Sequence, residues 1–239
     1  MPIYADPDVV PEIWVGALAS PAGSIVILNP DSGSGKTRDL RYAERVARAH
    51  EGGLEVLGYV DTGYGARPPE AVMADVDQYV SWYGVDGVFF DQASGALARL
   101  GHYRSITAAA RARGLAVALN MGVPDVHSGY AEIADVLGVF EGAPDAHRAA
   151  RFPSWMSDPT RLARLWHLVF DVPSEREMRD TLARAAEGPC DVIFVTDGRG
   201  PNPWSHLPGY WTSQLAALDA SGSGAPGPRP EASSSGPAS

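Results

Sequence analysis

Cysteine is nearly absent from this 239-residue chain, and because Cys190 is the only one, no intrachain disulfide can form. Cys190 lies beside the apolar run 192–195, which predicts a small buried residue rather than a nucleophile. No Cys/His spacing typical of a zinc site occurs, and we expect neither a metal nor a cofactor. No apolar run approaches the length that a membrane-spanning helix needs.

Basic residues are also scarce. Lys and Arg number 19 against 29 Asp and Glu, which gives a net charge of −10 and a pI near 5.0. This balance disfavours nucleic acid or an anionic membrane as partner and suits a neutral or cationic ligand. Residues 1–6 show no basic region followed by an apolar stretch, so we predict no signal peptide and a cytoplasmic location. A monomer is expected.

The chain divides into one domain and a tail. From Ser221 onward it consists almost entirely of Gly, Ser, Pro and Ala, which offer nothing to bury. We therefore predict a folded domain over residues 1–219 and a disordered tail over residues 220–239.

Short apolar runs alternate with helical or loop segments along the domain. A continuous apolar run bounded by turn residues is typical of a strand buried on both faces, as in a parallel sheet. Strands are predicted at 2–5, 24–28, 54–60, 88–90, 116–119, 136–140, 165–170 and 191–195. Helices are predicted at 39–50, 68–83, 100–113, 130–134 and 174–187. This alternation predicts an α/β fold, a single (β/α)₈ barrel of the TIM type.

Polar side chains follow most of these strands directly. They are Asn29, Asp61, Asp91 with Gln92, Asn120, Glu141 and Asp197. Because all strand ends of a barrel converge on one rim, these residues predict a single carboxylate-bearing cleft. Helix capping explains an Asp or Asn after a strand, but it explains Glu141 less well because Glu is a poor N-cap.

Aromatic residues lie near the same strand ends: Tyr4, Tyr59, Tyr64, Phe140, Trp204, Tyr210 and Trp211. Flat rings beside carboxylates are typical of a carbohydrate cleft, although packing in the core or a loop explains any single ring equally well. His167 lies in the middle of a predicted strand between apolar neighbours. We interpret it as a hydrogen-bonded barrel histidine rather than a catalytic one.

Residues 31–37 (DSGSGKT) follow a strand and look like a phosphate-binding loop. The position of the first glycine in that motif is Pro30, which has no N–H to offer a phosphate and a fixed φ. A nucleotide-binding function is therefore disfavoured, and a Gly/Ser-rich rim loop is the alternative.

With these residues in place, the chain resembles the spherulin-4 (spherulation-specific family 4) proteins. The matching blocks run in order from Pro2 to about Leu218, at 2–4, 27–33, 58–65, 82–91, 119–122, 140–141 and 196–211. The false phosphate loop corresponds to the Asn-Pro-x-Ser-Gly block of that family.

The resemblance implies a (β/α)₈ glycoside hydrolase, an endo-α-1,4-N-acetylgalactosaminidase that cuts galactosaminogalactan. It also implies an Asp-Glu pair after the fourth strand and a further Glu after the sixth, which here fall on Asp91, Gln92 and Glu141. Gln92 departs from the pattern because an amide cannot deliver a proton at neutral pH. Family members are often secreted or on the cell surface, which is the alternative to a cytoplasmic location.

Two hypotheses follow. In the first, the protein hydrolyses an α-1,4-linked galactosamine or N-acetylgalactosamine polysaccharide, with Asp91 and Glu141 as the catalytic carboxylates. The residues expected to bind substrate are Asn29, Asp61, Tyr64, Gln92, Asn120, Asp197 and Trp204. In the second, Gln92 leaves a barrel that binds the carbohydrate without cutting it.

Overall fold

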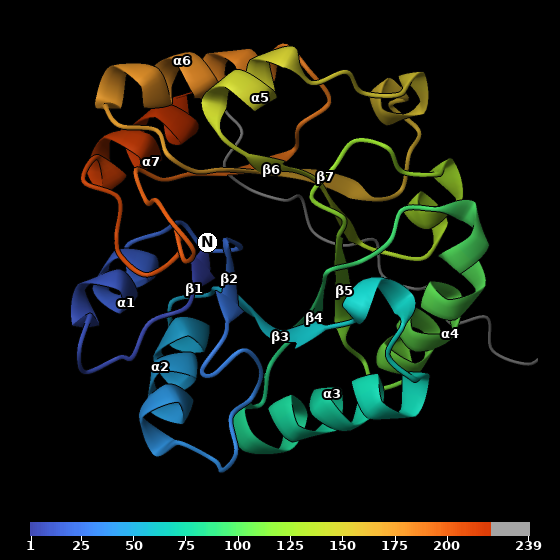
Figure 1. Ribbon diagram of the computed structural model, residues 1–239. Helices are drawn as coiled ribbons and strands as arrows, with labels where there is room; N and C mark the ends of the chain where they lie inside the picture. Colours follow the sequence, from blue (N-terminus) through green and yellow to red (C-terminus); the bar gives the residue numbers. More distant parts are fainter. Residues whose placement is uncertain (221–239) are drawn as a thin grey trace, which may run out of the picture.

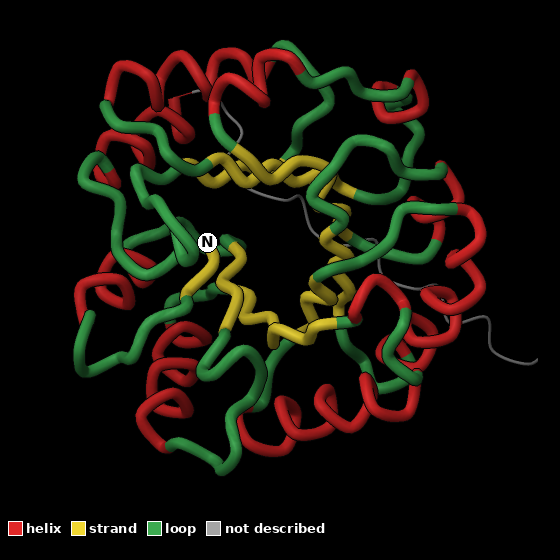
Figure 2. Tube along the Cα trace, in the orientation of Figure 1, coloured by secondary structure: helices red, strands yellow, loops and turns green. Residues whose placement is uncertain are grey.

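The computed structural model describes residues 1–220. Eight parallel strands form an inner layer that curls into a barrel, and helices surround it (Figures 1 and 2). The strands are β1 Pro2–Ile3, β2 Ile25–Leu28, β3 Glu55–Asp61, β4 Gly87–Asp91, β5 Ala116–Asn120, β6 Val136–Gly142, β7 Arg164–Val169 and β8 Val192–Val195. The helices are α1 Pro11–Leu18, α2 Leu40–Glu51, α3 Pro69–Tyr83, α4 Leu100–Arg111, α5 Pro144–Ala149, α6 Glu175–Ala186 and α7 Trp211–Ala220.

The α/β barrel and all eight predicted strands are confirmed. Each strand pairs in parallel with the next along the chain, from β1 with β2 to β7 with β8. β2 illustrates why the apolar runs are informative: all four of its residues are buried, because the barrel interior covers one face and helices cover the other. The predicted tail boundary falls in the last turn of α7, and residues 221–239 lie outside the described part of the chain.

Helix predictions were less complete. The helix predicted at 130–134 is wrong: a single 3₁₀ stretch, Ser128–Glu132, lies there. It contains Gly129 and is too short to nucleate an α-helix, so its bonds run over three residues, as from Tyr130 N–H to His127 O. Helices α1, α5 and α7 were not predicted, although α1 and α5 both begin with the proline that favours a first turn.

Side chains of different strands fill the barrel interior. Phe89 of β4 lies edge-on to Trp166 of β7 with ring centroids 5.9 Å apart, and Tyr59 of β3 stacks on Phe89 at 6.4 Å. On the outer side, Tyr79 of α3 packs directly against β3 at Gly58. A Cβ at Gly58 would lie 2.5 Å from Tyr79 Cγ, so only glycine fits under that ring.

The seam between β8 and β1 is held by the segment that follows β8. The first strand was predicted to extend to residue 5, but it ends at Ile3. The backbone of Tyr4 forms hydrogen bonds with the segment after β8 instead of continuing the pairing with β2. Tyr4 N–H donates to Trp204 O at 3.2 Å, and Asn202 Nδ2 donates to Tyr4 O at 3.1 Å. Further along, Trp211 Nε1 of α7 donates to Gly16 O of α1 at 2.8 Å, so α7 covers the seam (Figure 1).

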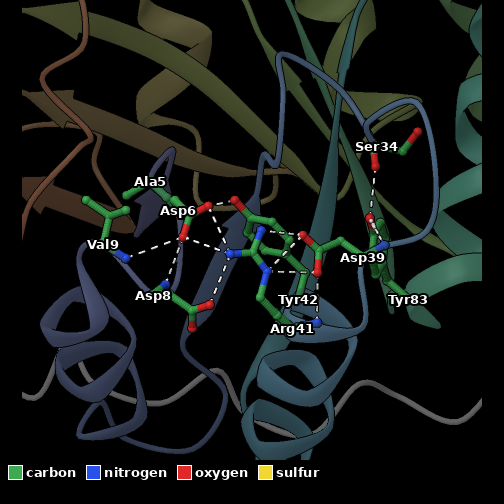
Figure 3. A network of polar contacts seen from close by, with 9 residues as sticks. All are labelled: Ala5, Asp6, Asp8, Val9, Ser34, Asp39, Arg41, Tyr42 and Tyr83. Carbon is green, nitrogen blue, oxygen red and sulfur yellow. Dashed lines mark hydrogen bonds and ion pairs between the residues drawn. The ribbon is translucent and has the colours of Figure 1, made fainter.

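A charged network fastens the loop after Tyr4 to the start of α2 (Figure 3). The Arg41 guanidinium contacts Asp6 at 3.2 Å, Asp8 at 3.0 Å and Asp39 at 2.7 Å. Tyr42 OH adds a hydrogen bond to Ala5 O at 3.3 Å. Single exposed ion pairs contribute little stability, but three carboxylates on one guanidinium fix the loop that carries Tyr4 on the barrel rim.

Candidate active site

Two carboxylates and one amide meet at the carboxyl ends of three neighbouring strands. Asp91 is the last residue of β4, Asn120 the last of β5, and Glu141 the penultimate residue of β6. Asn120 Nδ2 donates to Asp91 Oδ1 at 2.8 Å and to Glu141 Oε2 at 2.7 Å. Because one nitrogen reaches both oxygens, these oxygens lie no more than 5.5 Å apart.

Asp91 accepts a second hydrogen bond from the barrel interior. Tyr59 OH donates to Asp91 Oδ2 at 2.8 Å. Burial, reinforced by the negative charge of Asp91, raises the pKa of the Tyr59 phenol far above its ordinary value, so this hydroxyl stays protonated and acts as a donor. With a donor on each oxygen, the Asp91 carboxylate is held in one orientation.

The surroundings of Glu141 favour the protonated form of its carboxyl group. Burial raises its pKa, the neighbouring charge of Asp91 raises it further, and the hydrogen bond from Asn120 opposes the rise. Two carboxyl groups with different surroundings are thus placed side by side, the arrangement that separates an acid from a nucleophile or base in glycosidases.

A hollow of about 50 Å³ opens over the pair. Its lining includes Tyr4, Asn29, Tyr59, Phe89, Asp91, Asn120, Glu141, Leu168 and Trp204. Tyr4, which directly follows β1, and Trp204, in the segment after β8, thus line the same hollow as the carboxylates. Of the predicted site residues, the hollow brings together Asn29, Asp91, Asn120, Glu141 and Trp204.

The other predicted residues do not line the hollow. Asp61 Oδ1 accepts from Gly63 N–H at 2.6 Å and shapes the turn after β3. Asp197 Oδ1 pairs with His206 Nε2 at 3.0 Å, and its Oδ2 accepts from Gly209 N–H at 3.2 Å, so it organises its own loop. A substrate-binding role for either residue stays a prediction.

Tyr64 and Gln92 form a strained pair beside the hollow. Both have left-handed backbone, with φ of 55° and 47°, which is unfavourable for residues other than glycine. Tyr64 N–H donates to Gln92 O at 2.6 Å, and the Tyr64 side chain is 60% exposed. Because Gln92 directly follows Asp91, this hydrogen bond holds an exposed tyrosine on the rim close to Asp91.

Several residues of the site were missed or misjudged from the sequence. Leu168 and Phe89 line the hollow, and alternation along β7 and β4 is the signal that places them inward. Phe140 instead packs outward, with its ring centroid 4.8 Å from that of His147. Tyr210 and Trp211 also point away, since their polar atoms bond Val172 O and Gly16 O.

The interpretations of His167 and of residues 31–37 are supported. His167 is buried, and its Nδ1 lies 3.0 Å from His147 Nε2, outside the hollow. Residues 31–37 lie in a loop, and α2 begins only at Leu40 with Asp39 as its cap, unlike a phosphate loop that opens directly into a helix. Cys190 is half-buried rather than fully buried, and burial raises its thiol pKa to about 12.

A second cavity, about 640 Å³, lies at the opposite end of the strands between β8, α6 and α7. Although Asp191 and Asp219 are among its lining residues, the chemistry of parallel barrels belongs to the carboxyl ends of the strands, so we assign the site to the smaller hollow. Among residues 1–220, no three His, Cys, Asp or Glu side chains are grouped to hold a metal ion. None of the described helices is long and apolar enough to cross a bilayer.

The fold and the hollow define the protein as an α/β barrel of the TIM type with paired carboxylates at its carboxyl rim. A family model described as Spherulation-specific family 4 matches residues 1–218, and the chain belongs to that family. Spherulin-4 of Physarum polycephalum is 30% identical over 161 residues, which are 65% of this chain and 48% of that protein. The chain thus aligns with about half the length of this relative.

Solved structures show the same fold. The structure of Aspergillus clavatus Sph3 in complex with GalNAc matches with a TM-score of 0.75 and 21% identity, over 91% of this chain and 94% of that one. The maltogenic α-amylase AmyB of Thermotoga neapolitana matches at 0.53 and 11% identity, over 87% of this chain and 70% of that one.

Proposed function

We propose that this protein is a retaining glycoside hydrolase that cuts α-1,4-linked galactosamine or N-acetylgalactosamine polysaccharide. The observation that carries the proposal is the separation of the two carboxylates, whose facing oxygens lie within 5.5 Å of each other. Retaining glycosidases place their carboxyl groups about 5–5.5 Å apart, whereas inverting enzymes leave about 6.5–9.5 Å for a water molecule. The family and the GalNAc-bound Sph3 neighbour support the choice of sugar.

In the first step, protonated Glu141 acts as general acid and Asp91 as nucleophile. The Asp91 carboxylate attacks the anomeric carbon, the glycosidic C–O bond breaks, and the Glu141 proton passes to the leaving oxygen. In the second step, Glu141 takes a proton from water, whose oxygen displaces Asp91 from the anomeric carbon. Glu141 suits the acid role because burial and Asp91 raise its pKa.

Gln92 does not remove a member of this pair. Its side chain does not line the hollow, whereas its backbone carbonyl accepts from Thr62 Oγ1 at 2.8 Å and so belongs to the rim. The rings of Tyr4 and Trp204 are placed to meet the apolar faces of sugar units. The net charge of −10 favours a partly deacetylated, cationic polymer. The predictions of a monomer and of a cytoplasmic location stay predictions.

The test is incubation of the purified protein with partly deacetylated α-1,4-galactosaminogalactan, followed by reducing-end and mass analysis of the products. We expect short oligosaccharides whose new anomeric centres initially keep the α configuration by NMR. Asp91→Asn and Glu141→Gln should abolish their release. Asp77→Asn and Glu175→Gln, on exposed ion pairs of α3 and α6, are the matched controls and should keep wild-type activity. Full activity in D91N or E141Q would refute the assignment.

A carbohydrate-binding barrel without hydrolysis is the second candidate, and Gln92 is the observation that favours it. Retention of the polymer on immobilised protein, with no release of oligosaccharides, would support this alternative. Gln92→Glu then discriminates further, because activity gained by that variant would identify a hydrolase that has lost one acid.

A further inference from the structure

We propose that Asn120 is a positioning residue that fixes the separation of Asp91 and Glu141, and that Gly138 lacks a side chain so that Asn120 can do so. This inference rests on the proposed hydrolase for its kinetic part. Its structural part, a clamp between two carboxylates, is independent of the substrate.

The hydrogen bonds of Asn120 determine which way its amide points. Both N–H groups of Nδ2 are used, one on Asp91 and one on Glu141. Exchanging the amide oxygen and nitrogen would set the oxygen against two carboxylates, so only one orientation is stable. In that orientation Oδ1 is buried and has no hydrogen-bond partner among the described residues, a cost that the two charge-assisted bonds offset.

Gly138 provides the space for the unpartnered oxygen. It is the register partner of Asn120 on β6, and a Cβ at Gly138 would overlap Asn120 Oδ1 and lie 3.0 Å from Asn120 Cγ. The backbone of Gly138 is outside the left-handed region, so its φ does not call for glycine. A side chain is excluded at Gly138 because the Asn120 amide occupies the space where it would lie.

An irregularity in β6 makes both Gly138 and Glu141 face the barrel interior, where the Asn120 side chain lies. On β7, Trp166 and Leu168 both face inward and are two residues apart, as the alternation of a regular strand requires. Their partners on β6 are Gly138 and Glu141, which are three residues apart. The register shift between Gly138 and Phe140 supplies the extra residue. Without it, Glu141 would face the helices when Gly138 faces the interior, and Asn120 would lose one of its two carboxylates.

The clamp has a chemical consequence. Two carboxylates this close repel each other when both are charged, and hydrogen bonds donated to the charged form reduce that repulsion. Loss of the Asn120 donors would remove the hydrogen bond that lowers the pKa of Glu141, so this pKa would rise. Separation of the carboxylates would weaken the opposite effect of the Asp91 charge, but that effect is the smaller of the two. The high-pH side of the activity profile, which follows the general acid, would then move to higher pH.

The decisive variant is Gly138→Ala, because it displaces the Asn120 amide without changing any polar group. Asn120→Ala and the isosteric Asn120→Asp remove the donors directly. Gly101→Ala on α4, where a Cβ meets nothing within 4 Å, is the matched control. Each protein is checked for a cooperative thermal transition, then assayed for kcat, KM and pH profile, and the Glu141 carboxyl is titrated by ¹³C NMR.

We expect kcat to fall about 100-fold in Gly138→Ala and in both Asn120 variants with KM little changed, since small misplacements near reacting groups cost this much. The Glu141 titration should move to higher pH in all three variants and stay unchanged in Gly101→Ala. An unchanged titration and kcat in Gly138→Ala would overturn the proposal. If the wild type cleaves nothing, the NMR titration alone decides the clamp, while the hydrolase fails separately.

Discussion

Acidification should destabilise this protein through a buried histidine pair. His167 of β7 is 1% exposed and His147 of α5 is 4% exposed. His147 Nε2 and His167 Nδ1 share a hydrogen bond of 3.0 Å, and the His167 ring stacks on Phe152 with centroids 4.9 Å apart. Only one nitrogen of that contact can carry a proton, so the hydrogen bond is lost when both imidazoles are protonated.

Burial, together with the neighbouring His147, lowers the pKa of His167 from 6.5 to about 3. Burial also lowers the pKa of His147, as do Arg184 and Arg148 nearby. Because the folded state binds the proton more weakly than the unfolded state, the stabilisation is complete above pH 6.5. It is lost progressively as the pH falls from 6.5 towards 3.

Linkage gives the magnitude of the effect. Between pH 7 and pH 5, His167 alone should remove about 2 kcal/mol from the free energy of unfolding, and His147 should add to this loss. Native domains are stable by only about 5–15 kcal/mol, so such a loss is easily measured. The ordinary pKa values of Asp and Glu lie below this window, but the amino group of Met1, whose pKa burial lowers from 8.0 to about 5, also titrates in it. The difference in slope between the wild type and a His167 variant therefore isolates the contribution of the histidine.

The assay is urea unfolding at pH 7, 6 and 5 for the wild type, His167→Gln and the control His127→Gln. Gln at 167 keeps a polar group that can bond His147 but cannot titrate, so the slope of stability against pH should decrease. His127 is exposed, and its replacement should leave the slope unchanged. Equal slopes in wild type and His167→Gln would refute the reasoning.

Two further predictions concern the interior. Gly58→Ala should lower the free energy of unfolding by about 1–3 kcal/mol, because its Cβ would press on Tyr79, and a Tm equal to that of the wild type would contradict the packing described for β3 and α3. Tyr59→Phe removes the hydroxyl that donates to Asp91. Because hydrogen bonds to charged groups contribute about 1.5–3 kcal/mol, kcat on galactosaminogalactan should fall about tenfold to a hundredfold. A wild-type kcat would show that this hydroxyl does not orient the nucleophile.

The barrel itself was predictable because parallel strands are buried on both faces and therefore appear as apolar runs, as in β2. Convergence of the strand ends predicted that Asp91 and Glu141 would share one cleft, and they do meet across β5. The choice of these two residues as the catalytic pair came from the resemblance to the spherulin-4 proteins.

Features that depend on contacts between distant segments were not predictable. Helix α7 has small and polar residues mixed with apolar ones, so no apolar stripe at helical period announces it. The Asp197 carboxylate forms a hydrogen bond with His206 of its own loop, and no periodicity in the sequence indicates this contact. The register shift at Gly138 and Phe140, and the space left for Asn120, arise only when β5, β6 and β7 are assembled.

The seam between β8 and β1 is closed by contacts between the two ends of the described chain. Its hydrogen bonds join Asn202 to Tyr4 and Trp211 to Gly16, positions 198 and 195 residues apart in the chain. Contacts of such sequence separation carry a large loop-closure cost and form late in folding. On a ribosome, Asp91, Asn120 and Glu141 emerge well before Trp204, so the segment that brings this ring to the hollow can join the barrel only after all three strand ends have been synthesised.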